Sequence, residues 1–554
     1  MLLSSSMAAN FSNKIFQYAT IHKKSIIALM VVLPFFIVYS VFSILQYYSL
    51  GTSAFDLGVN AQELYNFIHT GSFYTPLLGE NALAQHFTLF KFLQVPLYYV
   101  FPSPITLMIF EDIFIALAGY IVYLLSMNLL KDHIKSEKLL FLVSIGFLLS
   151  YEFSPFSESL VSFSFHNMAF LPFFFLLAFY AFLTERRILH IVSIVFIISL
   201  HANFVYIVAV LLLYEFLFLH TYRGKKINIW FLQNINSRRI VNFSIFILAI
   251  VLLYGYVVLA GIIKLHLAGI SSISILPTTG ETGTPAGSPI GLVLLLLEKP
   301  GKFTSILSVN SVGKIFFINL LFKSNLYIPL FSPMSLILSI PYMLYAFPSS
   351  NPSYVQLGYQ YPAMVLGAIY ISALIGIYNL IRLGKYIYHH SKQIRLKLQK
   401  ILSLKHERVG IAIVSLLIVL VVVISIPYGI LSPMELEHTP GRSQMNDIYE
   451  EIPRGSTTFL INVSHQLPKN SYILTENILM PYFSNDLHVY ISPHSPGYHN
   501  LSKFQYIIIQ YNSFWATCGG PHSLQNIVNR ELESGNYSIM ESYQPGIILV
   551  LQRR

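Results

Sequence analysis

The residues best suited to chemistry in this chain are ionisable side chains that gather at one set of predicted helix ends. They are Asp56, Glu63, Glu80, His86, Glu152, Glu158, His166 and His201. Ionisable groups beside a lipid bilayer are costly, so they are candidates for function by default. The chain has no GxxxxGKS/T, GxGxxG, HExxH or GxSxG motif, which argues against nucleotide hydrolysis and zincin chemistry.

Asp56, in the segment Ala-Phe-Asp-Leu-Gly, has two interpretations. Asp is favoured at helix N-caps, where its carboxylate accepts free N–H groups. Alternatively, Asp56 is a general base that takes a proton from an acceptor hydroxyl while a phosphorylated donor lies beside it. A capping Asp can also be catalytic, so both interpretations stay open.

Three histidines, His86, His166 and His201, occupy outer ends of predicted helices. Each alone fits a hydrogen-bonded histidine at the membrane interface. Together they could contact a lipid-linked phosphate or, with Asp56, hold a divalent cation, although no local spacing supports a metal site. The single cysteine, Cys518, excludes an intramolecular disulfide and a Cys-based zinc site.

Tyr359 and Gln360 lie on a further outer turn, in Leu-Gly-Tyr-Gln-Tyr-Pro. Aromatic residues there fit the interfacial belt of a membrane protein, but the pair could also hold a sugar ring by stacking and hydrogen bonding. The predicted substrate-binding set is Gln62, Glu80, His86, Glu158, His166, His201, Asn203, Tyr359 and Gln360.

The composition requires a membrane to position these residues. Of the 554 residues, 55 % are hydrophobic and only 10 % are charged, whereas soluble domains average about 25 % charged residues. The net charge of +10 comes in short basic blocks between apolar runs, which is typical of topology signals rather than of a nucleic-acid surface. We expect membrane lipids as partners and no nucleic acid; the oligomeric state stays open.

Apolar runs predict about eleven transmembrane helices, with the N-terminus in the cytoplasm and the C-terminus outside the cell membrane. The basic clusters 131–138, 186–187, 223–239 and 382–408 then lie inside. A further apolar stretch, 87–101, does not fit this count and is predicted to be re-entrant or interfacial. The predicted crossings are 25–48, 105–130, 139–151, 168–183, 188–200, 204–219, 240–263, 306–322, 326–347, 362–383 and 409–431.

The first outer loop, within residues 51–103, contains an apolar stripe typical of an amphipathic helix, formed by Leu57, Ala61, Leu64 and Ile68. We expect this helix to lie on the outer membrane surface. Residues 1–431 form the predicted membrane module, and the polar residues 432–554 a small extracytoplasmic α/β domain. Its predicted strands are 472–475, 487–491, 504–511 and 547–551, with a helical stripe from Leu524 to Leu532.

An ordered series of short motifs resembles a family of archaeal and bacterial predicted membrane proteins, domain of unknown function 2079. The motifs are 55–58 (FDLG), 85–87 (QHF), 101–104 (FPSP), 165–166 (FH), 349–352 (SSNP), 357–361 (LGYQY) and 487–490 (LHVY). The resemblance covers most of the chain, from about residue 50 to about residue 510.

This family is similar in layout to the GT-C superfamily of membrane glycosyltransferases, which transfer sugars from polyprenyl-phosphate carriers outside the cytoplasm. The resemblance implies an all-α, GT-C-like membrane fold, with Asp56 as the acidic base and His86 and His166 at donor-side positions. In the family that this chain resembles, many members have a Lys-Glu-Asp triplet at the position where this chain has His-Ala-Asn, at 201–203. That departure removes one Lys and two carboxylates, which bears on metal binding and phosphate contact.

The leading hypothesis is therefore a glycosyltransferase that uses a polyprenyl-phosphate-linked sugar at the outer membrane face. A non-catalytic binder or transporter of lipid-linked glycans is one alternative. A membrane scaffold that displays the C-terminal domain is another.

Overall fold

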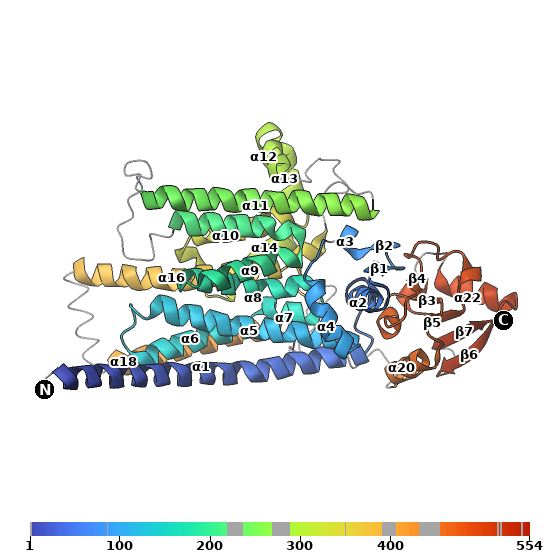
Figure 1. Ribbon diagram of the computed structural model, residues 1–554, viewed down its shortest axis with the longest axis horizontal. Helices are drawn as coiled ribbons and strands as arrows, with labels where there is room; N and C mark the ends of the chain where they lie inside the picture. The colour runs from blue at the N-terminus through green and yellow to red at the C-terminus, as the bar shows by residue number, and fades with distance from the viewer. Residues whose placement is uncertain are drawn as a thin grey trace.

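The computed structural model describes residues 3–85, 87–218, 237–268, 289–349, 351–390, 406–430, 455–517, 520, 523–544 and 547–554. The predicted site residue His86 and the cysteine Cys518 lie outside these residues. The long helices run side by side along the long axis of the molecule, and a five-stranded sheet stands at one end, opposite the N-terminus (Figure 1). We call this the sheet end of the helical bundle.

Four helices in the described part of the chain are long and apolar enough to cross a membrane. They belong to α1 (Leu3–Tyr48), α5 (Pro104–Leu130), α16 (Ala363–His390) and α18 (His406–Ser425). Each coincides with a predicted crossing. Lys24 on α1 forms a 2.8 Å ion pair with Glu137 at the start of α6, so the start of α6 meets the beginning of the apolar span Lys23–Tyr48 of α1, at the end of the spans opposite the sheet (Figure 1). We call it the basic end.

Two further helix pairs qualify as spans only when each bent pair is counted as one. The first joins α6 (Glu137–Glu152) to α7 (Pro155–Ser162) at a 40° bend. The second joins α13 (Pro300–Ser308) to α14 (Ser311–Lys323) at 74°. The described residues thus give four to six spans by length and composition, and the predicted count of about eleven is not confirmed.

One remaining predicted crossing, 240–263, falls on the continuous 32-residue helix α11, and the others fall on helices that are short or interrupted. A helix of 14 residues such as α9 is ~21 Å long, whereas the hydrocarbon core is ~30 Å thick. The other helices of the bundle are α8 (Leu171–Leu183), α9 (Arg187–Leu200), α10 (Val205–Phe218), α11 (Ser237–Ala268), α12 (Pro289–Glu298) and α15 (Ile340–Ala346). Short 3-10 turns precede several of them: η2 (Asn167–Phe170), η3 (Ala202–Phe204), η4 (Ile328–Phe331), η5 (Ser335–Ser339) and η6 (Pro352–Val355).

The first loop folds between the bundle and the sheet (Figure 1). It contains a single π-helical turn, η1 (Ala54–Gly58), the hairpin β1 (Tyr74–Thr75) and β2 (Glu80–Asn81), and the helices α2 (Val59–Thr70), α3 (Ala82–Gln85) and α4 (Lys91–Val100). The stretch predicted to be re-entrant or interfacial, 87–101, holds the ten-residue helix α4, which packs on α2.

The predicted amphipathic helix forms as α2, but its surroundings differ from the prediction. Ala61 and Leu64 on the stripe are buried, and so are four polar residues off it, Asn60, Gln62, Glu63 and Asn66. A helix on a membrane surface would keep its polar face in water. The polar face of α2 is therefore packed against protein rather than exposed to water, and the expected position on the outer membrane surface stays a prediction.

The C-terminal sheet has the strand order β4-β3-β5-β7-β6. β3 pairs in parallel with β4 and β5, whereas β7 is antiparallel to both β5 and β6. The strands are β3 (Ile473–Thr475), β4 (Val489–Ile491), β5 (Tyr506–Gln510), β6 (Tyr537–Tyr543) and β7 (Ile548–Arg553). Helices α20 (Ser456–Gln466), α21 (Phe514–Thr517) and α22 (Leu524–Glu533) accompany them. The four predicted strands and the predicted helix are present, and β6 and α20 were not anticipated.

Both faces of the sheet are buried, because alternate residues enter two different cores. Ile473 and Ile508 belong to the large apolar core that continues into the helical bundle. Their neighbours Leu474 and Ile507 pack instead with Val528 of α22. The period of two along a strand explains this division, and it fixes the sheet firmly against the bundle.

Close packing of α5 on α6 gives a first prediction. A Cβ atom at Gly119 would lie 2.1 Å from Oε1 of the buried Glu152, so the substitution Gly119→Ala must displace a buried side chain. We expect it to lower the free energy of unfolding by about 1–3 kcal/mol, measured by denaturant unfolding in detergent. The control is Gly255→Ala on α11, where no heavy atom lies within 4 Å. Equal stability of the two variants would contradict this packing.

Candidate functional site

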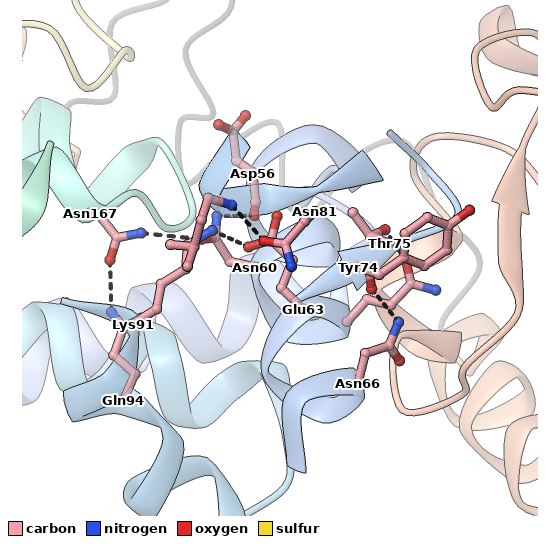
Figure 2. A network of polar contacts seen from close by, with 12 residues as sticks. Asp56, Asn60, Glu63, Asn66, Tyr74, Thr75, Asn81, Lys91, Gln94 and Asn167 are labelled. Carbon is pink, nitrogen blue, oxygen red and sulfur yellow. Dashed lines mark hydrogen bonds and ion pairs between the residues drawn. The ribbon is translucent and has the colours of Figure 1, made fainter. Parts of the chain in front are cut away.

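Asp56 lies inside the π-helical turn η1, at the sheet end of the bundle. The preceding residue Ser53 is extended (φ −127°, ψ 161°) and makes no side-chain cap. Asp56 itself does not cap α2 as one interpretation of the sequence suggested. No hydrogen bond to its carboxylate occurs among the described residues, and the carboxylate points away from the nearby amide network (Figure 2). π-Helical turns are rare and recur at functional sites.

Partial burial shifts the pKa of the Asp56 side chain. Removal of the half-buried carboxylate from water disfavours its charged form and raises its pKa to about 7. Near neutral pH the side chain is therefore divided between carboxylate and acid. A group with this property is suited to general base catalysis, because it can accept a proton and release it again.

Glu111 on α5 brings the second loop to Asp56. Its carboxylate oxygens accept the backbone N–H of His166 at 3.2 and 3.4 Å, and it also interacts electrostatically with Asp56. A further electrostatic interaction joins Asp56 to Tyr361, just before α16. Glu111, which binds the second loop through His166, and Tyr361 therefore both interact electrostatically with Asp56 from segments that are far apart in the sequence.

Sequence reasoning missed Glu111, although a signal was present. Glu111 and Asp112 form an acidic pair inside an otherwise apolar predicted crossing, and both are buried. Ionisable residues within a membrane helix mark functional or structural sites by default. Asp112 makes a side-chain hydrogen bond with Ser43 of α1, so the two neighbouring carboxyls face different partners.

A chain of buried amides fixes the main chain at Asp56. Gln94 on α4 donates to Asn167 Oδ1 at 2.8 Å, and Asn167 donates to Asn60 Oδ1 at 3.1 Å. Asn60 donates in turn to the carbonyl oxygen of Asp56 at 2.7 Å (Figure 2). Asn167 and Asn60 each both accept and donate, so a shift of either residue would leave another buried polar group without its partner. The network therefore positions η1.

A buried ion pair lies beside this amide network. Lys91 on α4 contacts the carboxylate of Glu63 on α2 (Figure 2), and both side chains are buried. Burial raises the pKa of Glu63, and the Lys91 ammonium opposes that rise. Lys91, Gln94 and Tyr98 are spaced i, i+3 and i+7 and are the buried residues of α4. This polar stripe was a readable signal that α4 packs against protein.

An aromatic wall adjoins His166. The Phe163 ring lies 6.2 Å from the His166 ring and 5.9 Å from that of Tyr359, between ring centroids. Ser159 Oγ donates to the Tyr359 carbonyl at 3.1 Å and accepts the Gly358 N–H at 2.7 Å, which holds this loop on α7. Gln360 is buried, and its Oε1 has no hydrogen-bond donor within the described residues.

His201 and Asn203 are polar residues that line a mostly apolar cavity of about 190 Å³. His201 Nδ1 accepts the backbone N–H of Asn203 at 3.1 Å. Tyr345 also lines this cavity, and its ring lies 6.2 Å from that of Tyr361, the residue that interacts with Asp56. The remaining lining is largely apolar: Met168, Phe204, Tyr206, Ile207, Ala209, Val210, Ile340, Pro341, Leu344 and Met364.

Three other predicted site residues lie in different surroundings. Gln62 faces the sheet: its Nε2 donates to the carbonyl of Val489 at 3.2 Å. Glu80 on β2 interacts electrostatically with Lys264 of α11. Glu158 Oε2 accepts the backbone N–H of Ile430 at 2.5 Å. This bond holds the segment that follows the C-terminal end of α18 against α7. No contact in the described part of the chain joins these three to Asp56.

The hypothesis of a divalent cation held by Asp56 and histidines gains no support from this arrangement. Within the described ranges, no three His, Cys, Asp or Glu side chains are grouped as metal ligands. The site offers acid–base chemistry through the Asp56 carboxylate, which can gain and lose a proton near neutral pH. Around it lie His166, the buried amide oxygen of Gln360 and a mostly apolar cavity.

Comparisons with known proteins address the whole chain. The model of a family described as "Predicted membrane protein (DUF2079)" matches residues 46–549. No curated protein matches the chain. Among solved structures, the chain is similar to the apo crystal structure of the Archaeoglobus fulgidus oligosaccharyltransferase, with 11 % identity and a TM-score of 0.40. That match covers 86 % of this chain and 69 % of the other, and so loose an overlap says nothing about residue roles.

The buried ion pair gives a second prediction. Lys91→Met leaves the Glu63 carboxylate buried without its partner, which should cost about 3–5 kcal/mol of unfolding free energy. The double variant Lys91→Met/Glu63→Leu removes both charges and should recover most of that loss. Thermal unfolding in detergent compares the three proteins. A double variant no more stable than the single one would show that charge pairing is not what the site requires.

Proposed function

We propose that this chain, which belongs to the DUF2079 family of predicted membrane proteins, is a glycosyltransferase. It would move a sugar from a polyprenyl-phosphate-linked donor to a hydroxyl acceptor at the outer face of the cell membrane. The observation that carries the proposal is the state of Asp56: a half-buried carboxylate without a hydrogen-bond partner among the described residues, with a pKa of about 7, where three segments converge.

In this reaction Asp56 acts as the general base. It takes the proton from the acceptor hydroxyl while the acceptor oxygen attacks the anomeric carbon of the sugar. The bond from that carbon to the phosphate oxygen breaks, and its electron pair leaves with the lipid phosphate. Asp56 then passes its proton to water, which a group of pKa about 7 does readily near neutral pH.

The apolar cavity supports a lipid-linked donor. It lies between α10, α15 and the start of α16, and its contact with Tyr345 links it through Tyr361 to Asp56. A polyprenyl chain is apolar and its phosphate is polar. The cavity offers both kinds of surface, a mostly apolar lining and the polar side chains of His201 and Asn203.

The aromatic wall supports a sugar beside Asp56. Tyr359 and Phe163 offer ring faces, and carbohydrates commonly stack on aromatic side chains. The buried Gln360 Oε1 is an acceptor for a sugar hydroxyl, since an unpaired buried carbonyl costs about 1–3 kcal/mol. His166 adjoins the same wall and shares Glu111 with Asp56.

The outer location is supported by the distribution of basic residues. Lys24 and Lys131 lie at the basic end, as do Lys135 and Lys138 in the turn before α6 and in its first turn. Lys and Arg beside membrane helices favour the cytoplasm. The sheet end, with Asp56, would then face outward.

The third prediction tests the base directly. Asp56→Asn keeps the size of the side chain but removes its basicity, so transfer should slow by about 10²- to 10⁴-fold. Mass spectrometry of lipid-linked sugars and surface glycans, in cells that lack the native gene and carry each variant, measures the effect. The control is Asp132→Asn, an exposed carboxylate just beyond α5, ~30 Å along that helix from Glu111.

Two outcomes would count against the assignment. A folded Asp56→Asn protein that restores normal glycans would exclude Asp56 as the base. Normal lipid-linked sugars with or without the protein would exclude the donor class and favour a non-catalytic binder or scaffold.

The fourth prediction concerns pH. Only the deprotonated form of Asp56 acts as a base, and its pKa is about 7. Below that pH the transfer rate should rise about tenfold per pH unit, and above it the rate should level off. Initial rates in membrane vesicles buffered at a series of pH values measure this profile. A rate that falls as pH rises through 7 would contradict the role of Asp56.

A further inference from the structure

The C-terminal sheet holds the turn that carries Asp56. Asn477 lies two residues after the end of β3. Its side-chain Oδ1 accepts the backbone N–H of Ala54 at 2.8 Å. Ala54 is the first residue of η1 and is fully buried. N–H groups at the start of a helical turn have no partner within it, and Ser53 makes no side-chain cap. Asn477 therefore supplies the missing cap from the other part of the chain.

Two more residues of the same turn contact the C-terminal part. A Cβ atom at Gly58 would lie 2.4 Å from Sδ of Met480, so only glycine permits this approach. The ring of Phe55 lies 5.1 Å from that of His494. Both ends of η1 and its second residue are thus held by residues that follow strands β3 and β4, while the carboxylate of Asp56 projects elsewhere (Figure 2).

The main chain at Asn477 is held in place by hydrogen bonds of the preceding residue. The preceding residue, Glu476, is fully buried. Its carboxylate accepts the backbone N–H of Gln510 and the hydroxyl of Ser513, each at 2.5 Å. These bonds tie the end of β3 to the end of β5, so the amide of Asn477 has little freedom to follow a moving turn.

We propose that Asn477 is a positioning residue, through which the C-terminal sheet keeps η1 in its π-helical form and Asp56 in its productive orientation. A π-helical turn holds one more residue than an α-helical turn. Relaxation of η1 into a continuous α-helix with α2 would rotate Asp56 by about 100° around the helix axis. This inference rests on the proposed role of Asp56 and gives the C-terminal part a function in the same site.

The test compares two asparagines of the same interface. Asn485 bonds the first loop twice, through Tyr98 Oη at 2.7 Å and the Pro102 carbonyl at 2.6 Å, but neither bond involves η1. Asn477→Ala and Asn485→Ala both weaken the attachment of the sheet. Only Asn477→Ala removes the cap of η1.

The readout is the reactivity of Asp56 itself. Dicyclohexylcarbodiimide modifies protonated carboxyls, and peptide mass spectrometry of the full-length protein gives the pH of half-modification of Asp56. In the native protein this midpoint should lie at about 7. Glu111 and Tyr361 are the described groups that interact electrostatically with Asp56, and the nearby His494 faces Phe55. Substitution of Asn477 removes none of these groups. A change in the midpoint of Asp56 would therefore come from a change in its position and burial.

In Asn477→Ala the midpoint should move down by about one pH unit or more, toward the ordinary Asp value of ~3.9, and glycan transfer should fall at least about tenfold. Asn485→Ala should change neither. Ala54→Pro provides a second route, because it deletes the N–H donor at a position where proline is tolerated. The double variant Ala54→Pro/Asn477→Ala should add no further loss, since both changes remove one interaction.

Equal midpoints in Asn477→Ala, Ala54→Pro and Asn485→Ala would overturn the proposal. The measurement does not require a sugar substrate. A shifted midpoint without any glycan phenotype would therefore refute the glycosyltransferase function while leaving the positioning role of Asn477 intact.

Discussion

A layer of buried polar side chains between the helical bundle and the sheet is the constraint on which the rest of the structure depends. Buried amides and charges are costly unless each finds a partner. Here the partners come from different parts of the chain: Gln94 and Lys91 from α4, Asn167 from the second loop, and the sheet at Gln62. Satisfying this layer brings the first loop, the second loop and the C-terminal sheet together.

Asp56 differs from the charged residues of that layer, because its carboxylate has no hydrogen-bond partner among the described residues. Glu63, only seven residues further on, is buried against Lys91 and has a fixed structural partner. Asp56 has its main chain fixed by Asn60 and, at the start of its turn, by Asn477, but its carboxylate is left without a hydrogen bond in the described part of the chain. A rigid backbone with an uncommitted carboxylate is the arrangement that a preorganised base requires.

Sequence patterns predicted the long apolar helices, because α1, α5, α16 and α18 are continuous runs with little interruption. They also predicted four strands of the sheet, and they singled out Asp56 as a candidate base. An apolar stripe on α2 could not reveal whether its other face meets water or protein. The π-helical turn and its cap Asn477 depend on contacts more than 400 residues apart, which no local pattern encodes. Glu111 was readable in principle as an acid within an apolar run.

The most direct test of the central claim is an experimental structure of the protein with a non-hydrolysable polyprenyl-phosphate-linked sugar. We expect the apolar chain in the cavity beside Tyr345, with the anomeric carbon next to Asp56 and the sugar against Tyr359. A donor bound elsewhere on the protein, or an Asp56 carboxylate that faces lipid or the basic end, would contradict this expectation.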